Sequence, residues 1–230
     1  MKDLEKEKEL AAIKAVHYVQ NDMTVGLGTG STAYYLIREL GKKVSQGLQI
    51  TCVSSSKAST QLALENSLKI VPLSEVRILD INIDGADEFD PNLRLMKGGG
   101  GALLHEKILA SNAKFNLIIC DSSKQVSGFG KFKLPIETIP LATESIRYKL
   151  QTWGVSPVLR VRQEVLYRTE EGNMILDLDI SAVEDIESFN QQLIALPGVV
   201  ETGLFVNYAN LVLMGKEDSV VSFPPNPSAS

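Results

Sequence analysis

The sequence predicts an α/β protein in which a parallel β-sheet, covered by helices on both faces, carries a smaller inserted unit. Up to about Cys120, short apolar segments alternate with helix-like segments, which is the pattern of a parallel sheet. From about Lys131 the order of elements changes, and a strand-like segment at Leu211–Met214 returns to the first sheet. The chain has 230 residues. The commonest domain size is about 100 to 150 residues, so one large unit with an appendage fits this length.

The first part of the chain contains four strand candidates and a weaker fifth. They are short and rich in Val, Ile and Leu, as strands buried on both faces of a sheet are. Helix-like segments alternate with them, and the last of these begins after a glycine run. The strands are expected at Thr24–Leu27, Leu48–Val53, Val76–Ile83 and Phe115–Cys120, the weaker one at Lys69–Leu73, and the helices at Leu4–Val19, Ser31–Val44, Ala58–Glu65 and Ala102–Lys114.

The second part has the order strand, helix, strand, strand, helix, strand. This β-α-β-β-α-β order is that of the split βαβ, ferredoxin-like fold. The turn-forming residues 170–173 (EEGN) support a hairpin at its centre. The elements are expected at Pro135–Ile139, Glu144–Trp153, Pro157–Tyr167, Met174–Ile180, Val183–Leu196 and Val199–Phe205. The C-terminal residues 224–230 (PPNPSAS) are expected to form a frayed tail.

Composition excludes several classes of protein. With 44% apolar and 22% charged residues, the chain is neither disordered nor fibrous. A net charge of −5 argues against nucleic acid or an anionic membrane as the main partner. No segment approaches the ~18 consecutive apolar residues of a spanning helix, and the charged N-terminus lacks the apolar core of a signal peptide, so a cytoplasmic protein is expected. Cys52 and Cys120 end apolar runs and are expected to be free, buried thiols.

Polar residues follow four of the predicted strands. In an open parallel sheet, ligands bind at the carboxyl ends of the strands, so these four segments could together line one pocket. The segments are GLGTGST at 26–32, SSSK at 54–57, DGADE at 84–88 and DSSK at 121–124.

The first of these loops has the features of an anion site. Glycines let backbone N–H groups approach an oxyanion, and the N-terminus of the following helix adds a partial positive charge. Ser31 and Thr32 would add hydroxyl donors. One alternative is a tight turn with Ser31 as the N-cap. Another is a dinucleotide site, because Gly28, Gly30 and Ala33 fit the glycine pattern of dinucleotide-binding loops. The acidic residue expected about 20 positions further on is absent, which leaves only an NADP-type variant.

Two carboxylates, Asp84 and Asp87, lie three positions apart in a predicted turn, where both could face one centre. The alternatives are a solvated acidic loop or a Mg²⁺ or Ca²⁺ site, although the spacing lacks EF-hand order. Lys124 follows a strand and two serines and could bind a phosphate group. Its alternative is an ordinary surface lysine, the more common fate of this residue.

A run of four glycines, Gly98–Gly101, is difficult to explain by packing, because glycines lose much conformational entropy and have no side chains. A close approach of the backbone to a ligand explains it. The helix that follows places Glu106 on the same face as Ala102, Leu103, Leu109 and Ala110. Partial burial there would raise the pKa of Glu106 toward neutrality, as a general base or acid requires. The alternative is a surface glutamate.

Read together, the segments GLGTGST (26–32), DGADE (84–88), KGGGGALLHEK (97–107) and SKQV (123–126) closely resemble the type A ribose-5-phosphate isomerases. The likeness continues through PIETIPLA (135–142), GVSPVLR (154–160) and LPGVVETGLF (196–205), so it covers nearly the whole chain. It implies a Rossmann-like catalytic domain over residues 1–130 and 206–230, with a ferredoxin-like lid inserted over 131–205. It also implies a homodimer or larger homo-oligomer, without cofactor or metal.

The implied activity is the interconversion of D-ribose 5-phosphate and D-ribulose 5-phosphate in the non-oxidative pentose phosphate pathway. The resemblance places the catalytic glutamate on Glu106, which would move a proton between C2 and C1 through an enediolate. Lys97 and the glycine N–H groups would stabilise the oxyanion, and Asp84 and Asp87 would hold the sugar hydroxyls and assist ring opening. The implied substrate-binding residues are Thr29, Gly30, Ser31, Thr32, Asp84, Gly85, Ala86, Asp87, Lys97, Gly98, Gly99, Gly100 and Lys124. A non-catalytic sugar-phosphate sensor and an NADP-dependent reductase are the alternatives.

Overall fold

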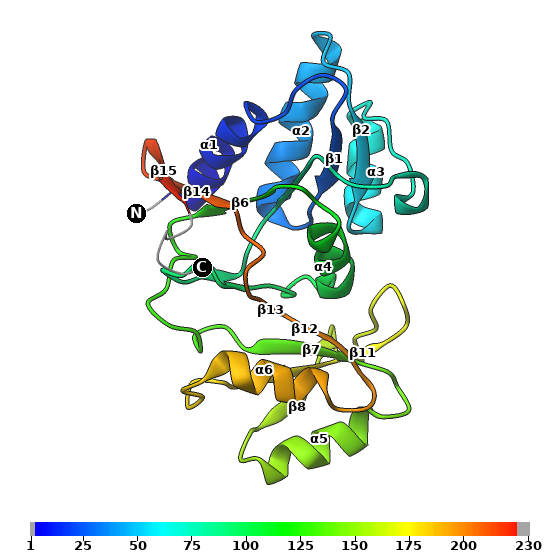
Figure 1. Cartoon of the computed structure of the whole chain (residues 1–230), viewed down its shortest axis with the longest axis vertical. Helices are drawn as coiled ribbons and strands as arrows, with labels where there is room; N and C mark the ends of the chain where they lie inside the picture. The colour runs from blue at the N-terminus through cyan, green and yellow to red at the C-terminus, as the bar shows by residue number, and fades with distance from the viewer. Residues whose placement is uncertain (1–2, 225–230) are drawn as a thin grey trace.

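The computed structural model describes residues 3–224, which form two units (Figure 1). The larger unit contains a six-stranded sheet of order β15-β14-β6-β3-β1-β2. Neighbouring strands are parallel except for β15, which pairs antiparallel with β14. The strands are β1 (Thr24–Leu27), β2 (Thr51–Ser54), β3 (Ile81–Asp84), β6 (Asn116–Asp121), β14 (Leu211–Lys216) and β15 (Ser219–Phe223). This parallel-dominated α/β sheet confirms the predicted fold class.

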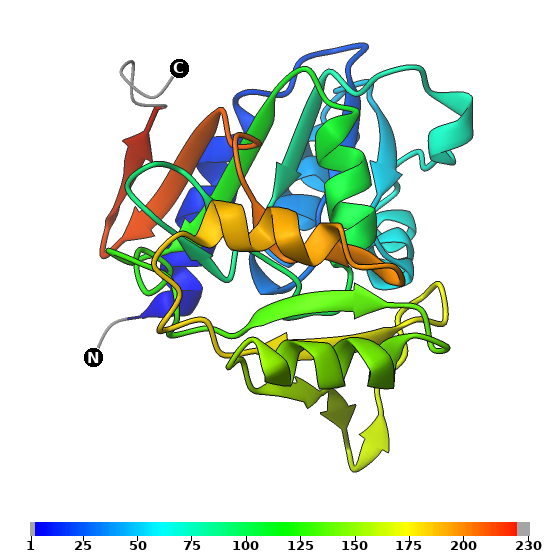
Figure 2. The ribbon, with the colours of Figure 1, turned by 60° about the horizontal axis from the view of Figure 1, so that its bottom comes forward.

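Helices cover both faces of this sheet (Figure 2). The helices α1 (Leu4–Val16), α2 (Ser31–Ser45) and α3 (Lys57–Glu65) share one apolar core with β1, β2 and β3. The helix α4 (Leu103–Ser111) lies on the opposite face, where it packs with a three-stranded sheet of order β13-β5-β4. Those strands are β4 (Glu88–Phe89), β5 (Leu95–Met96) and β13 (Leu204–Phe205).

The smaller unit is called the lid unit here and extends from β7 to β12. Its antiparallel sheet has the spatial order β12-β7-β11-β8. Along the chain, its elements follow the β-α-β-β-α-β order of the ferredoxin-like fold that the sequence predicts. Both of its helices share one apolar core with this sheet. The elements are β7 (Leu134–Thr138), α5 (Thr143–Thr152), β8 (Pro157–Leu159), β11 (Met174–Leu178), α6 (Ile186–Ile194) and β12 (Val199–Thr202). The domain boundaries at 130/131 and 205/206 stay a prediction.

Two of the predicted strands in this unit are wrong in extent. The segment 157–167 ends its sheet pairing at Leu159 and continues as a separate hairpin of β9 (Val161–Arg162) and β10 (Val165–Leu166). The turn of this hairpin places two residues other than glycine, Gln163 and Glu164, at φ of 49° and 65°. The segment 199–205 divides at Gly203, so that β12 joins the lid sheet and β13 joins the three-stranded sheet.

The larger unit also differs from prediction in places. Residues 69–73 do not form a strand; Ile70 makes a single bridge to Cys52, and a 3-10 turn η1 (Leu73–Glu75) follows. Pro72 lacks the N–H that would extend the ladder. The strands β4, β5 and β15 were not predicted. Of the predicted tail, residues 225–230 lie outside the described residues.

Both cysteines are free and buried, as predicted, and burial raises the pKa of Cys52 to about 12. Within residues 3–224, no helix is both long and apolar enough to cross a membrane.

Candidate active site

One cavity gathers most of the residues that the sequence singled out. It opens beyond the carboxyl ends of β1, β3 and β6, and its whole lining belongs to the predicted set. The lining consists of Thr29, Gly30, Ser31, Thr32, Gly85, Ala86, Asp87, Lys97, Gly98, Gly100, Glu106 and Lys124. The two remaining predicted residues, Asp84 and Gly99, contact members of this lining through hydrogen bonds or ion pairs. Their roles in catalysis and binding stay predictions.

The loop after β1 passes very close to the end of β3. A Cβ atom on Gly28 would lie 1.8 Å from Asp84 Oδ1, so this position needs glycine. Asp84 Oδ1 accepts the Thr29 N–H at 3.1 Å, which ties the loop to the acidic segment. The predicted N-cap is wrong: Gly30 is the N-cap of α2 and makes no side-chain cap bond, while Ser31 is the first helical residue. The helix N-terminus and the Ser31 and Thr32 side chains therefore border the cavity, as an anion site requires.

The serine loop after β2 does not line this cavity, contrary to the prediction for residues 54–57. It supports the first loop from behind. Ser56 Oγ lies 2.9 Å from Thr29 Oγ1, and the Ser59 hydroxyl donates to the Gly28 carbonyl at 2.7 Å. Ser56 is also the N-cap of α3, accepting the Ser59 N–H at 3.1 Å, so its hydroxyl is used within the protein. The Lys57 N–H donates to Glu170 Oε1 of the lid unit at 2.8 Å.

Three buried charges meet at one side of the cavity. Lys97 Nζ lies 2.9 Å from Asp84 Oδ2 and 3.3 Å from Glu106 Oε1. It also donates to the Gly85 carbonyl at 2.5 Å. Burial alone would lower the pKa of Lys97, but the carboxylates of Asp84 and Glu106 outweigh it and raise the pKa. Lys97 is therefore a permanently charged ammonium group.

Glu106 is only 5% exposed, so the alternative of a surface glutamate is wrong. Its helix α4 buries Leu103, Leu109 and Ala110, which belong to the predicted apolar face. Burial raises the pKa of Glu106 to about 8 against the opposing charge of Lys97, with a further contribution from Asp84. The second carboxylate oxygen, Oε2, is buried and has no hydrogen-bond partner within residues 3–224. Glu106 is thus a carboxyl group able to exchange a proton near neutral pH.

The glycine run holds Asp87. Asp87 Oδ2 accepts the Gly99 N–H at 2.7 Å. A Cβ atom at Gly99 would lie 2.7 Å from Asp87 Oδ1 and 2.9 Å from the Phe132 ring, so glycine is required for this approach. Asp84 and Asp87 accordingly use carboxylate oxygens on protein groups, and no group of three or more His, Cys, Asp or Glu in the described residues is arranged to hold a metal ion.

Sequence reasoning missed the residues of the lid unit that hold this region. Arg160 Nη1 donates to the Gly98 carbonyl at 2.6 Å, and Arg162 Nη2 donates to the Gly100 carbonyl at 3.0 Å. Arg160 falls within the GVSPVLR segment of the resemblance, but nothing local in the sequence indicates its partner. The partners lie 62 residues apart in the chain.

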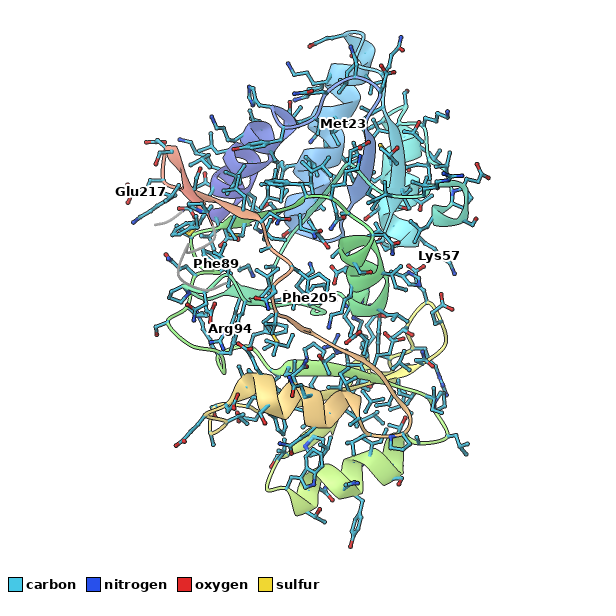
Figure 3. All side chains as sticks on the ribbon, viewed as in Figure 1. Met23, Lys57, Phe89, Arg94, Phe205 and Glu217 are labelled. Atoms are coloured by element: carbon cyan, nitrogen blue, oxygen red, sulfur yellow. The ribbon has the colours of Figure 1, made fainter. Side chains whose placement is uncertain are left out.

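The crossing from the lid unit back to the large sheet holds the other side. The Lys97 N–H donates to the Gly203 carbonyl at 2.8 Å. Lys107, the neighbour of Glu106, donates to the carbonyls of Thr202 and Leu204 at 2.8 and 2.9 Å. Its ammonium also lies 4.6 Å from the centroid of the Phe205 ring, which is labelled in Figure 3 to the left of α4.

A larger cavity of about 500 Å³ lies elsewhere, between β2, the segment 70–73 and α4. It is bordered mainly by apolar side chains such as Val53, Ile70 and Leu109, and His105 is the one titratable group in its lining. It therefore lacks the paired charges that proton transfer needs, and the smaller cavity is the better candidate for chemistry.

Known proteins are similar to this chain over most of its length. A family model for ribose 5-phosphate isomerase A (phosphoriboisomerase A) matches residues 51–219. The ribose-5-phosphate isomerase A of Dinoroseobacter shibae is 42% identical over 229 residues, covering 96% of this chain and 88% of its own length. That of Bacillus mycoides is 41% identical over 217 residues, covering 94% and 98%.

Solved structures are similar over the same extent. The crystal structure of ribose 5-phosphate isomerase A from Neisseria gonorrhoeae superposes with a TM-score of 0.91 at 37% identity, covering 98% of this chain and 99% of that one. A D-ribose-5-phosphate isomerase in complex with phospho-erythronic acid gives a TM-score of 0.93 at 36% identity, covering 97% and 100%.

Proposed function

This chain belongs to the ribose 5-phosphate isomerase A family and is a ribose-5-phosphate isomerase, and we propose that Glu106 is its catalytic base. Conversion of D-ribose 5-phosphate to D-ribulose 5-phosphate moves a proton from C2 to C1 and hydrogen between the two oxygens. We propose that the reaction passes through an enediolate and that one carboxylate serves both carbon atoms. The homodimer or larger homo-oligomer implied by the resemblance and the cytoplasmic location expected from the sequence remain predictions.

The observation that carries this proposal is the state of the Glu106 carboxyl group. One oxygen lies 3.3 Å from Lys97 Nζ, and the other is buried without a hydrogen-bond partner in the described residues, while the residue itself lines the cavity. A base must present a free oxygen to the proton it removes, in a site with little water. With a pKa of about 8, the group can take a proton from carbon and return it without being trapped in either state.

Lys97 is suited to stabilise the oxyanion of the enediolate. Two of its three donors are held firmly by Asp84 and the Gly85 carbonyl, and the contact to Glu106 is the longest at 3.3 Å. The third donor can therefore turn to a substrate oxygen. We propose that Asp84 acts mainly by fixing Lys97, since it is 1% exposed, and that Asp87, which lines the cavity, holds a sugar hydroxyl during ring opening.

The phosphate group would lie at the other end of the cavity. The N-terminus of α2 with Ser31 and Thr32 offers backbone and hydroxyl donors, and Lys124 offers a cation without an ion-pair partner in residues 3–224. Binding energy from this remote group orients C1 and C2 toward Glu106.

The test is turnover of ribose 5-phosphate by Glu106→Gln, without nucleotide and with a chelator present. The amide keeps the shape but accepts no proton, so we expect kcat to fall roughly 10²–10⁴-fold. Binding of arabinose 5-phosphate, measured by calorimetry, should be largely preserved. The matched control is Glu171→Gln, which removes a half-exposed carboxylate paired with His105 outside the cavity and should turn over normally. A Glu106→Gln enzyme with near-normal kcat would exclude Glu106 as the base.

A further inference from the structure

The carbonyl groups of the glycine run are held by side chains of the lid unit. Arg160 Nη1 lies 2.6 Å from the Gly98 oxygen and 3.4 Å from the Gly99 oxygen. Arg162 Nη2 and the Tyr167 hydroxyl reach the Gly100 oxygen at 3.0 and 3.2 Å. None of these three side chains lines the cavity. The lid unit therefore fixes the loop from its far side.

Arg160 is itself fixed within the lid sheet. Its guanidinium pairs with both oxygens of Asp177 on β11, with Nε 2.9 Å from Oδ2. The two side chains are 9% and 19% exposed. A bidentate, largely buried pair of this kind has a defined geometry, because the planar fork of the guanidinium matches the carboxylate. The remaining nitrogen of the guanidinium, Nη1, is thus aimed at the Gly98 carbonyl.

One peptide group connects this arginine to the cavity. The Gly98 carbonyl and the Gly99 N–H belong to the same planar trans peptide, so they point in opposite directions. Arg160 binds the carbonyl, and Asp87 Oδ2 accepts the N–H at 2.7 Å. A cation on the oxygen polarises the peptide and strengthens its N–H as a donor. Asp177, Arg160, the peptide and Asp87 therefore form one continuous hydrogen-bonded chain.

We propose that Arg160 is a positioning residue for the isomerisation, which sets the plane of the peptide between Gly98 and Gly99 and through it the orientation of the Asp87 carboxylate. The inference rests on the proposed function of the cavity. Arg160 does not reach the cavity, so its effect passes through the peptide. The lid unit thus contributes to the reacting end of the site through the glycine run.

The kinetic test is Arg160→Met, which keeps the aliphatic stem and removes the guanidinium. Misplacement of a group by about 1 Å can cost on the order of 10²-fold, so we expect kcat to fall about 10- to 100-fold. KM should change by less than about threefold, because the phosphate end is untouched. The matched control is Arg168→Met. Arg168 likewise donates to a glycine carbonyl, in this case that of Gly172 within the lid unit, at 3.0 Å. This variant should keep wild-type kinetics. Wild-type kcat in Arg160→Met, or a defect seen only in KM, would overturn the proposal.

A second measurement does not depend on turnover. The Gly99 amide proton, followed by NMR, should exchange with solvent at least about tenfold faster in Arg160→Met and at the wild-type rate in Arg168→Met. Unchanged exchange in Arg160→Met would overturn the proposal. If the wild-type protein failed to turn over ribose 5-phosphate, the proposed function would fail, whereas this exchange experiment would still decide whether Arg160 holds the peptide.

Asp177→Asn covers the case in which Arg160→Met does not fold. It retains Arg160 and removes only the charge that anchors it. We expect kcat to fall several-fold with KM unchanged. A wild-type kcat would overturn the proposal that the hydrogen-bonded chain from Asp177 to Asp87 positions the site.

Discussion

The two ends of the cavity are built in different ways. At the phosphate end, the residues 29–32 and Lys124 directly follow strands of one sheet and offer N–H groups, hydroxyls and a partly exposed ammonium. At the reacting end, Asp84, Lys97 and Glu106 are at most 5% exposed and are paired with one another. An end that only binds an anion needs donors, whereas an end that moves protons needs buried charges with shifted pKa values.

The support of the two ends differs accordingly. The phosphate loop is held by residues of the same unit, such as Asp84 at the end of β3 and Ser56 at the N-cap of α3. The reacting end is also held by the lid unit and the strand that leaves it, through Arg160 and the Gly203 carbonyl. Buried charges tolerate little displacement, which explains why they need contacts from two units.

After Glu106→Gln, the largest effect is expected for Lys97→Met, which removes the cation of the reacting end. Loss of one preorganised donor to an oxyanion typically costs about 10²–10³-fold in kcat, and we expect a loss of this size. Asp84 and Glu106 are then left buried without their partner, so thermal stability should also fall. Lys114→Met is the control, because that lysine pairs with Asp80 at the surface. If folded Lys97→Met enzyme keeps kcat within threefold of wild type, the oxyanion is stabilised elsewhere.

The next prediction is the pH dependence of kcat/KM, which tests the reacting end through the ionisation of Glu106. Glu106 must be ionised to act as a base, and its pKa is raised to about 8 by burial. We therefore expect kcat/KM to rise about tenfold per pH unit up to about pH 8, so that at pH 6 it lies roughly 100-fold below the plateau. Steady-state rates between pH 6 and 9 test this. A flat profile over that range would mean that Glu106 is already ionised in the free enzyme.

A smaller effect is expected at the phosphate end, for Lys124→Ala. A hydrogen bond to a charged group contributes about 1.5–3 kcal/mol, which corresponds to a rise in KM of roughly tenfold or more. The value of kcat should stay within about threefold, because no buried charge loses its partner. An unchanged KM for ribose 5-phosphate would show that Lys124 does not bind the phosphate group.

The difference between the two ends also explains which features could be predicted from the sequence. The residues after each strand and the apolar face around Glu106 follow from local rules. These rules brought Thr29, Asp87 and Glu106 to one cavity, and they placed Asp84 beside it, where it pairs with Lys97. The serine loop shows the limit of the strand-end rule. Ser56 follows β2 but its hydroxyl caps α3 and supports Thr29, so the rule alone cannot separate lining from support.

The contacts that fix the reacting end could not be predicted in this way. Arg160 meets a carbonyl 62 residues away, and its target is backbone, which has no signature in the sequence. The division of residues 199–205 at Gly203 is of the same kind. The apolar residues at both ends of this segment indicate a strand, but they do not show that the chain changes sheets beside Lys97.

The last prediction concerns stability, and it distinguishes the two ends by its dependence on pH. Burial raises the pKa of Glu106 from its ordinary value of 4.5 to about 8 in the folded protein, so folding favours its protonated form. Its contribution to stability is therefore fully present below about pH 4.5 and is lost as pH rises to about 8. Glutamine does not titrate. Glu106→Gln should consequently gain thermal stability relative to wild type as pH rises from 5 to 8. Each kcal/mol of difference in the free energy of unfolding corresponds to roughly 2–4 °C in melting temperature.

Melting temperatures of wild type, Glu106→Gln and Lys124→Ala at pH 5 and pH 8 check this prediction. The difference between Lys124→Ala and wild type should be nearly the same at both pH values, because this substitution leaves the Glu106 carboxyl group in place. A wild-type protein that is stabilised relative to Glu106→Gln on going to pH 8 would mean that Lys97 holds Glu106 ionised in the folded state. The expected result would instead show that the reacting end keeps a carboxyl group at the expense of stability near neutral pH, whereas the phosphate end does not.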